Sequence, residues 1–459
     1  MVRRIALFIC IFVLAFGVLS SIALSKAKVE ITVAGPEDTK ENQTAIELLR
    51  DKIARFEKQY PDIKVKLMHY AYNPQTFAIK QAGRTGPDVF GTWATEGRVL
   101  AEKGWIAPLD EYIKTWPKAD MVNPAAYLPF TVDGKIYGIP DGGYVKHIMY
   151  NKKMFKERGL QLPKMNWTWE EFIEAAKKLT DQAKGIAGFA PMTRGTEGGW
   201  QLTDFIYQAG GECEERVGGK WKAVWDSEEA IKALQFVKDM KWKYDILPQN
   251  WSLAYMDVYN LFATGKAAMV PHGDWTVEWV INNFKWDPAD IGLVPMPKGP
   301  GPKGRQAGVQ GGNFTVINGL TSKEKRDAAF KWINFERWDK GEIEAYKKQI
   351  EDYRSKGIKL AVFTYPVLKP DSPIQRERDR IALANPDVAV VWPAEFRMYL
   401  LKTGHVEPPI ECQKMYGEAM APAIQAVLAD KNADPERIMK ESAKKFQKEV
   451  LDPFNAQNQ

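Results

Sequence analysis

Strands and helices alternate after the N-terminal segment, and this alternation constrains the fold more than any other feature. Residues 29–35 (VEITVAG) have the alternating pattern of a strand. Residues 44–60 carry apolar side chains at steps of three and four, as on one face of a helix, and Pro61 ends that helix. Residues 62–70 alternate again, and 87–93 (PDVFGTW) form a further short strand. The order predicts α/β layers around a largely parallel sheet.

The rest of the chain carries clear turn and capping signals. Asp133-Gly134 predicts a hairpin turn, Thr168 to Glu171 a capping box, and Asp434-Pro435 a helix start. A Gly/Pro/basic loop near 298–308 lacks a helix close behind it, so we expect an exposed flap rather than a phosphate cradle. Residues 361–410 are rich in proline, and we expect them to be irregular.

The N-terminus has the pattern of a secretory signal peptide. Arg3 and Arg4 precede an apolar run, and small residues follow up to Ala27. The apolar run is almost long enough to span a bilayer, so a retained anchor is the alternative reading. We expect cleavage, with residues 1–27 as the signal peptide and the mature protein exported to the periplasm or the outer face of the cytoplasmic membrane.

Composition excludes several classes of protein. The net charge of +6 is spread along the chain without a dense basic run, which argues against a nucleic-acid partner. The four His are far apart and lack metal-ligand spacing, so we expect no metal and no cofactor. No nucleophile elbow or zinc-protease motif occurs, and we expect no catalytic residue. Cys213 and Cys412 either pair or stay as buried free thiols; we expect free thiols.

The stretch 262–280 (FATGKAAMVPHGDWTVEWV) allows two interpretations, a nucleotide-binding loop or another kind of binding site. A phosphate-binding P-loop requires Gly and a hydroxyl residue where this chain has Asn260 and Ala267. Gly265 is better explained as a left-handed helix cap. Trp275 then stands in the first turn of the next helix, after a buried strand. Such a Trp either packs in the core or offers a flat face for stacking on a sugar ring.

Four stretches, taken in order, resemble the extracellular solute-binding proteins of ABC importers, in particular the sugar-binding group that includes maltose-binding protein. They are LLRDKIARFEKQYPDIKVKL, AGRTGPDVFGTW, GKIYGIP…IMYNKKMFKERGL with TWEEFIEAAKKL, and FATGKAAMVPHGDW. The similarity covers 29–335 and, more loosely, 410–450. Residues 336–409 depart from the family pattern.

The resemblance implies a two-lobed, periplasmic-binding-protein-like α/β fold, with the ligand cleft between lobes joined by hinge strands. It places residues 28–140 and 309–366 in lobe 1, and residues 141–308 and 367–459 in lobe 2. Chain crossings are expected near 138–143, 307–312 and 365–369, where Gly and Pro allow backbone change on closure.

The candidate ligand-binding residues follow from the resemblance and from positions at strand ends, at helix starts and in loops. Trp275 is the leading candidate because it matches the family's stacking Trp. Glu37 and Asp38 follow the first strand, where carboxylates accept hydroxyl hydrogen bonds. Trp200 follows the expected loop RGTEGG. The remaining candidates are Trp93, Tyr144, Gly312, Asn313, Trp392 and Glu395.

The function implied is capture of a carbohydrate, with an oligosaccharide expected, and its delivery to the permease subunits of an ABC importer by a monomer. A non-sugar solute of polyamine or glycerol-phosphate type is the alternative. An exported glycoside hydrolase is the third reading, since one sequence does not exclude two carboxylates at the separation that catalysis requires.

Overall fold

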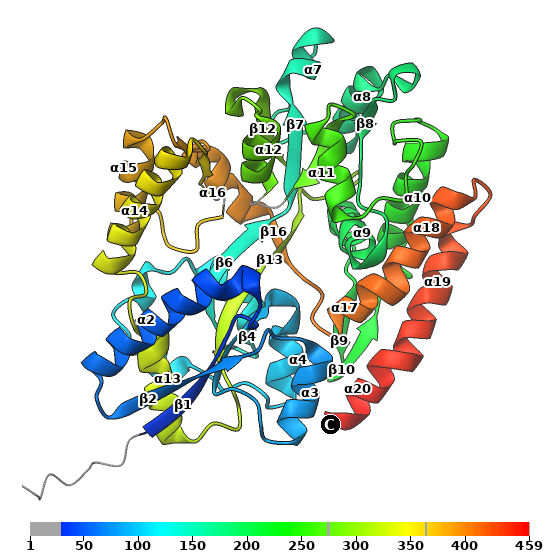
Figure 1. The fold of residues 1–459 in the computed structure, drawn as a ribbon. Coiled ribbons are helices and arrows are strands. Elements are labelled where there is room, and N and C mark those ends of the chain that lie inside the picture. The colour runs from blue at the N-terminus through cyan, green and yellow to red at the C-terminus, as the bar shows by residue number, and fades with distance from the viewer. Residues whose placement is uncertain (1–28, 273–275, 363–364, 459) are drawn as a thin grey trace, which may run out of the picture. The chain divides into compact units, whose positions relative to one another are not determined.

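The structure is a computed structural model that describes residues 29–272, 276–362 and 365–458. Its chain divides into two compact units, and Figure 1 shows their helices and strands. The first unit comprises the described residues up to Phe90 together with Leu320–Phe335. The second unit comprises the described residues of Gly91–Gly319 and Glu336–Gln459.

The first unit is built on parallel strands, as the alternating pattern predicts. Strand β1 (Val29–Gly35) pairs in parallel with β2 (Ile63–His69) along its whole length and with the start of β3 (Val89–Trp93). Phe56 of the intervening helix is fully buried and makes edge contacts with the rings of Trp332 and Phe335. Aromatic packing therefore joins the 320–335 segment to the N-terminal strands. The helices of this unit are η1 (Lys40–Asn42), α2 (Gln43–Gln59), α3 (Pro74–Ala82) and α13 (Lys323–Asn334).

The second unit contains a four-stranded sheet in the order β12-β7-β11-β8. Strand β7 (His147–Asn151) is antiparallel to both β12 (Ile291–Pro295) and β11 (Ala267–His272), and β11 is parallel to β8 (Ala187–Phe189). All residues of β7, β8 and β11 are buried, which explains their nearly continuous apolar sequence.

A separate set of strands in the second unit carries two of the expected crossings. Strand β6 (Ile139–Val145) runs antiparallel to β13 (Gly308–Ile317), so the segments near 138–143 and 307–312 lie side by side. Strand β13 also pairs in parallel with β16 (Gly404–Val406), a strand that the sequence did not predict. A Cβ at Gly312 would lie 2.2 Å from the Gly142 carbonyl oxygen, so the close approach of β6 and β13 requires glycine there.

The described residues of the second unit also contain three short strand pairs and a set of helices, which Figure 1 labels where there is room. The pairs are β4 (Thr131–Val132) with β5 (Lys135–Ile136), β9 (Glu214–Val217) with β10 (Lys220–Ala223), and β14 (Leu360–Ala361) with β15 (Ala389–Val390). The helices of the second unit up to residue 290 are η2 (Ala94–Glu96), α4 (Gly97–Glu102), α5 (Asp110–Ile113), η3 (Ala119–Met121), α6 (Pro124–Tyr127), η4 (Leu128–Phe130), α7 (Lys152–Glu157), α8 (Trp169–Leu179), η5 (Gln182–Lys184), α9 (Gly195–Ala209), α10 (Glu228–Trp242), α11 (Tyr255–Ala263), α12 (Thr276–Phe284) and η6 (Pro288–Asp290). The later helices are α14 (Lys340–Lys356), α15 (Pro373–Ala384), α16 (Ala394–Thr403), α17 (Cys412–Lys414), η7 (Met415–Met420), α18 (Ala421–Ala429), α19 (Pro435–Phe446), η8 (Gln447–Leu451) and α20 (Asp452–Gln457).

Several local predictions are confirmed. Gly265 has φ +69°, the left-handed geometry expected of a helix cap. Asp133 and Gly134 both have positive φ at the turn between β4 and β5. The side chain of Asp434 accepts hydrogen bonds from two backbone amides at the start of α19. Cys213 and Cys412 are buried free thiols.

The expectation that residues 361–410 are irregular was wrong. Helix α15 begins at Pro373 behind the capping residue Ser372, and α16 begins directly after Pro393. Both prolines therefore stand at helix starts, where the missing amide hydrogen costs no hydrogen bond. The proline content that suggested loops instead marks the beginnings of two helices.

The capping box at the start of α8 allows a local test. The Thr168 hydroxyl accepts from the Glu171 amide at 3.3 Å, and the Glu171 carboxylate accepts from the Thr168 amide at 2.8 Å. Thr168→Ala removes the first bond, so we expect the free energy of unfolding to fall by about 1 kcal/mol. Denaturant unfolding measures this change, and a loss below ~0.3 kcal/mol would contradict the role of the cap.

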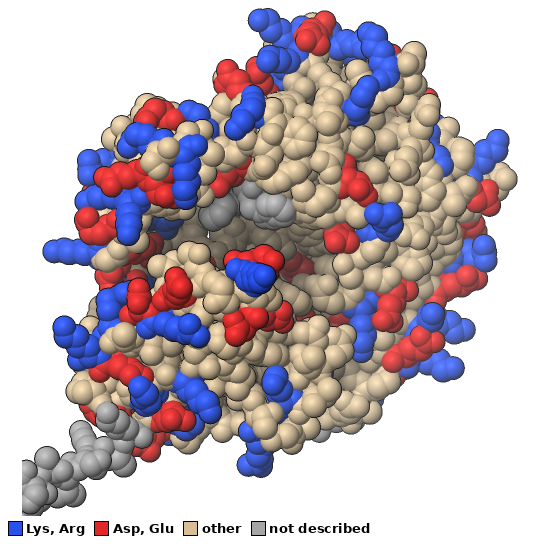
Figure 2. Space-filling model, viewed as in Figure 1, with Lys and Arg blue, Asp and Glu red and all other residues tan. Residues whose placement is uncertain are grey.

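Charged side chains of both signs are interspersed over the face in view (Figure 2). This mixture agrees with the modest net charge of +6 and with the absence of a dense basic run in the sequence. None of the helices within the described residues combines the length and the apolar character needed to cross a bilayer.

Candidate ligand-binding site

A cavity of about 220 Å³ in the second unit gathers aromatic and polar side chains from five separate parts of the chain. Tyr144 comes from β6, and Trp200 comes from α9. Because four of the lining residues are aromatic, the walls offer flat apolar faces beside hydrogen-bonding groups. The lining residues are Tyr144, Thr196, Glu197, Trp200, Tyr255, Glu407, Gln413 and Tyr416.

Glu407 holds two of the aromatic residues in place. The Tyr144 hydroxyl donates to Glu407 Oε1 at 2.5 Å, and the Tyr416 hydroxyl donates to Oε2 at 2.9 Å. The Cys412 thiol also approaches Oε2, at 3.7 Å. The carboxylate therefore connects the end of β6, the residues after β16 and helix η7. Both tyrosine rings are fixed by the same acid, which makes the wall that they form pre-organised.

Burial shapes the protonation of this cluster. Loss of solvent raises the pKa of Glu407, and the hydrogen bonds from Tyr144 and Tyr416 oppose that rise. The same burial, with the nearby Glu407 charge, raises the pKa of the Tyr144 hydroxyl well above its usual value. The Tyr416 hydroxyl has a raised pKa for the same main reason. The two hydroxyls therefore stay protonated and remain hydrogen-bond donors.

Trp200 lies against a buried ion pair. The Lys146 ammonium stands 3.7 Å from the centre of the Trp200 ring and 2.5 Å from Asp204 Oδ2, and Lys146 and Asp204 are both fully buried. Asp204 Oδ1 accepts from the Val309 amide of β13 at 2.8 Å. The ring of Tyr144 meets Trp200 edge to face at 5.6 Å. A cation below and a ring at its edge fix the indole plane.

The Lys146–Asp204 pair stays charged mainly through its own contact, with help from the Val309 amide on Asp204 and from the Glu407 charge on Lys146. Burial lowers the pKa of Lys146 and raises the pKa of Asp204, each toward the uncharged form. Attraction between the two groups opposes both shifts. Both groups therefore stay charged while they face each other, and either one alone would be a buried charge without compensation.

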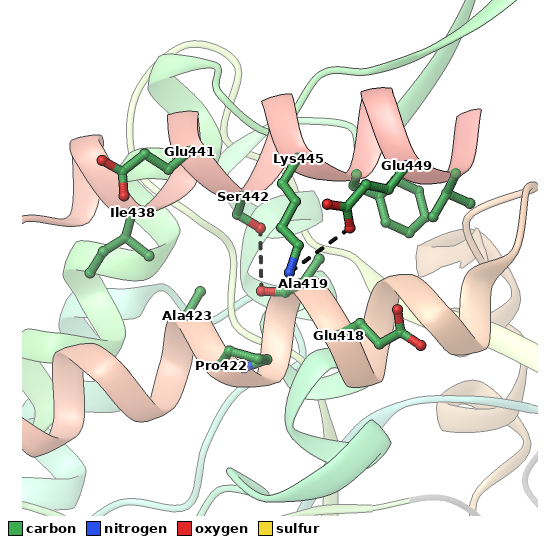
Figure 3. Close-up of a pocket in the computed structure, with 11 residues that line it drawn as sticks. Glu418, Ala419, Pro422, Ala423, Ile438, Glu441, Ser442, Lys445 and Glu449 are labelled. Atoms are coloured by element: carbon green, nitrogen blue, oxygen red, sulfur yellow. Dashed lines mark hydrogen bonds and ion pairs between the residues drawn. The ribbon is translucent and has the colours of Figure 1, made fainter. Parts of the chain in front are cut away.

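A second cavity, of about 280 Å³, lies between the C-terminal helices (Figure 3). Ser442 of α19 donates to the Ala419 carbonyl at 3.3 Å, and Lys445 reaches Glu449 at 3.9 Å. Its lining consists of side chains from η7, α18, α19 and η8 that pack helix on helix. The lining contains one aromatic residue, Phe446, so this groove lacks the convergent aromatic walls of the first cavity.

A third cavity, of about 530 Å³, contains a buried acid. Glu214, at the start of β9, is 7% exposed, and its Oε2 accepts from the Ile410 amide at 2.8 Å. Its Oε1 has no hydrogen-bond partner among the described residues. Burial raises the pKa of Glu214 to about 8. Arg98 and Arg216 also line the cavity, and both lie over the Trp221 ring.

The predicted site residues have different positions in the structure. Tyr144 and Trp200 lie together in the first cavity. The segment before Trp200 is not the expected loop, because α9 already begins at Gly195. Trp275 lies outside the described residues, so its expected contact with ligand stays a prediction.

The other candidates are not part of that lining. Trp93 is 41% exposed at the end of β3, and Trp392 is buried. Glu37 and Asp38 are exposed, and Asp38 accepts from the Gln43 side chain at 2.8 Å. Their roles remain predictions, as do those of the exposed or half-buried residues Gly312, Asn313 and Glu395.

Sequence reasoning missed most of the cavity. Glu197 stands in the quoted stretch RGTEGG, and its three-residue distance from Trp200 is one helical turn, so a helix prediction would have paired them. Glu407 and Tyr416 are nine residues apart, and no periodicity predicts their contact. The other missed residues are Thr196, Tyr255 and Gln413. Within the described ranges, no group of three or more His, Cys, Asp or Glu residues is arranged to hold a metal ion.

The sheets and helices described above make the chain an α/β protein with an aromatic-lined cavity. The chain belongs to the family of bacterial extracellular solute-binding proteins, which it matches over residues 38–335. An ABC transporter extracellular-binding protein from Pyrococcus horikoshii is 28% identical over 285 residues, covering 59% of this chain and 61% of that one. A galactooligosaccharide-binding protein from Bacillus subtilis is 27% identical over 296 residues, covering 61% and 62%.

The matched region thus spans about 61–62% of the length of these relatives. Among solved structures, an ABC substrate-binding protein from Listeria monocytogenes in complex with cycloalternan superposes with a TM-score of 0.67. It is 23% identical, and the match covers 92% of this chain and 98% of that one. The likeness confirms the predicted fold class and the resemblance on which it rested.

Proposed function

We propose that this protein captures a carbohydrate, an oligosaccharide by preference, and delivers it to an ABC importer. The observation that carries the proposal is the aromatic cavity, where Tyr144, Trp200, Tyr255 and Tyr416 surround polar groups. Sugar rings expose C–H faces that stack on aromatic rings, while their hydroxyls bond to polar neighbours. Relatives named as galactooligosaccharide-binding and arabinooligosaccharide-binding proteins support this class of ligand.

The proposal includes export and a division into lobes. Residues 1–27 act as a signal peptide, and the mature protein works as a monomer in the periplasm or at the outer face of the membrane. Residues 28–140 and 309–366 form one lobe, and residues 141–308 and 367–459 form the other. The partners are the permease subunits of the importer, and the protein releases its ligand unchanged rather than acting as an enzyme.

An oligosaccharide panel tests the class of function. We expect one or more oligosaccharides to raise the melting temperature, because a ligand in large excess over its Kd adds about 3–4 kcal/mol of apparent stability. Chromatography of the recovered sugar should show no cleavage product. Cleavage would make the protein a carbohydrate-active enzyme, and a panel without any binding sugar would contradict the proposal.

Trp200→Ala tests the cavity itself. Trp200 lines the cavity, and its indole plane is held in place by its neighbours. We therefore expect its loss to weaken binding of the tightest-binding sugar of the panel by about 2 kcal/mol, roughly thirtyfold in Kd. Calorimetry measures the change. Trp242→Ala is the matched control: Trp242 also lies over a lysine, Lys241 at 4.1 Å, but on α10 and outside the cavity lining.

The control separates binding from folding. Each substitution deletes a partly exposed Trp that contacts a lysine ammonium, so both should lower the free energy of unfolding. Only Trp200→Ala should change the Kd for the sugar. Equal affinities for the two variants would remove Trp200 from the site. Trp275→Ala then becomes the next test, because Trp275 is the leading candidate from the sequence.

A further inference from the structure

The cavity that contains Trp200 is acidic as well as aromatic. Two of its lining residues, Glu197 and Glu407, are acids, and none is Lys, Arg or His. Glu197 lies in the first turn of α9, next to Thr196, whose hydroxyl is 3.5 Å from Glu197 Oε2. The site thus presents carboxylate oxygens between aromatic faces.

Hydrogen-bond donors are scarce in the same lining. The Tyr144 and Tyr416 hydroxyls already donate to Glu407. The Trp200 indole nitrogen is covered by protein and has no partner among the described residues, so it does not present a donor to the cavity. The Thr196 hydroxyl donates to Glu197 Oε2 at 3.5 Å, and the Gln413 amide donates to Thr95 Oγ1 at 3.5 Å. Acceptors therefore dominate.

The charges around the cavity favour a cation. Lys146, below Trp200, is neutralised by Asp204 at 2.5 Å. Arg194, which precedes α9, is exposed and pairs with Asp257 at 3.0 Å. The lining itself contains no Lys, Arg or His, although the charge of the buried Lys146 also acts on Glu407. An ammonium group donates three hydrogen bonds, accepts none, and is attracted to the faces of aromatic rings.

We propose that the preferred ligand is an amino sugar, a saccharide that carries a protonated amine held by Glu197 among the aromatic rings. The inference rests on the proposed function and narrows its ligand class. A neutral sugar hydroxyl both donates and accepts, so it uses this acceptor-rich lining less fully than an ammonium does. The aromatic faces still stack on the sugar ring, and the amine supplies the additional selectivity.

Matched sugars that differ only at C2 test the inference. The probes are glucose, glucosamine and N-acetylglucosamine, the same set for galactose, and the trisaccharides cellotriose, chitosan trisaccharide and its N-acetylated form. We expect the amine to bind about tenfold more tightly than the hydroxyl or acetamide partner in at least one set, by calorimetry at low ionic strength. Added salt should reduce that preference.

The Glu197→Gln variant is a second test of the amino-sugar inference. It removes the charge and keeps the side-chain length, so we expect amine affinity to fall about tenfold and neutral-sugar affinity to fall by a smaller factor. Glu170→Gln is the control, because Glu170 is an exposed acid in the first turn of α8 and lies outside the cavity lining. It should change neither affinity.

The outcomes separate the two proposals. If neutral oligosaccharides bind and no amine binds better than its partners, the amino-sugar inference is overturned and the proposed function stands. If no saccharide binds in any set or in the oligosaccharide panel, both are overturned. An amine preference that Glu197→Gln leaves intact also overturns the inference, because the charge assigned to it would not recognise the ligand.

Discussion

Replacing Lys146 by Met is expected to lower the free energy of unfolding by about 3–5 kcal/mol. Lys146 and Asp204 are fully buried, and their charged atoms are 2.5 Å apart. The substitution keeps an unbranched chain of similar size but removes the ammonium. Asp204 then remains as a buried carboxylate whose nearest compensation is the Val309 amide at 2.8 Å. Removing one partner is costly because the remaining charge has lost both its ion pair and its hydration.

A double variant separates the charge from the packing. In Lys146→Met with Asp204→Asn the charge is absent, and the amide oxygen still accepts from Val309. We expect the double variant to be more stable than Lys146→Met alone. Lys177→Met is the surface control: Lys177 pairs with Glu174 at 3.0 Å, but both are exposed, so the loss should stay below about 1 kcal/mol. Equal losses for Lys146→Met and Lys177→Met, measured by urea unfolding, would show that the buried pair contributes no more than a surface pair.

The fold could be predicted from the sequence where local rules apply. Period-two and period-3.6 patterns gave β1, α2 and β2, and turn chemistry placed Gly265 and the Thr168 capping box. These features depend on residues close together in the chain. The prediction for residues 361–410 was wrong because the local signal there is ambiguous. Proline is compatible with both a loop and the first turn of a helix.

The candidate site could be predicted only in part. Tyr144 and Trp200 were found because an element boundary or a family pattern marked their positions. The hydrogen bond between Tyr144 and Glu407 joins residues 263 positions apart, and no sequence period encodes such a distance. The Lys146–Asp204 pair could not be predicted for the same reason. Lys146 precedes β7 and Asp204 lies on α9, and only the folded chain brings the two side chains together. Long-range polar contacts arise from tertiary packing, which one sequence does not display.

The second large expected effect is a pH dependence of the free energy of unfolding, caused by Glu214. Burial raises its pKa from 4.5 to about 8 in the folded protein. Below pH 4.5 the group is protonated in both the folded and the unfolded chain, and stability is not affected. Between pH 4.5 and 8 the unfolded chain ionises first, so the free energy of unfolding falls as pH rises. The loss at pH 8 is on the order of 4 kcal/mol.

Glu214→Gln should remove that loss. The glutamine oxygen still accepts from the Ile410 amide, which Glu214 Oε2 accepts at 2.8 Å, and the side chain has no charge to desolvate. We therefore expect the variant to exceed the original protein in stability by about 4 kcal/mol at pH 8 and to approach it near pH 5. Urea unfolding at several pH values measures the difference, with Glu215→Gln, the exposed neighbour, as the control.

The difference between variant and original protein isolates Glu214 from other buried groups. Burial lowers the pKa of His147 to about 4, and that of His272 falls well below its usual value, so both histidines reduce stability as pH falls below 6.5. Their effect has the opposite sign to that of Glu214 and is common to both proteins, so it cancels in the comparison. Parallel pH curves for the original protein and Glu214→Gln would mean that Glu214 ionises normally in the folded chain, with water reaching its carboxylate from the third cavity.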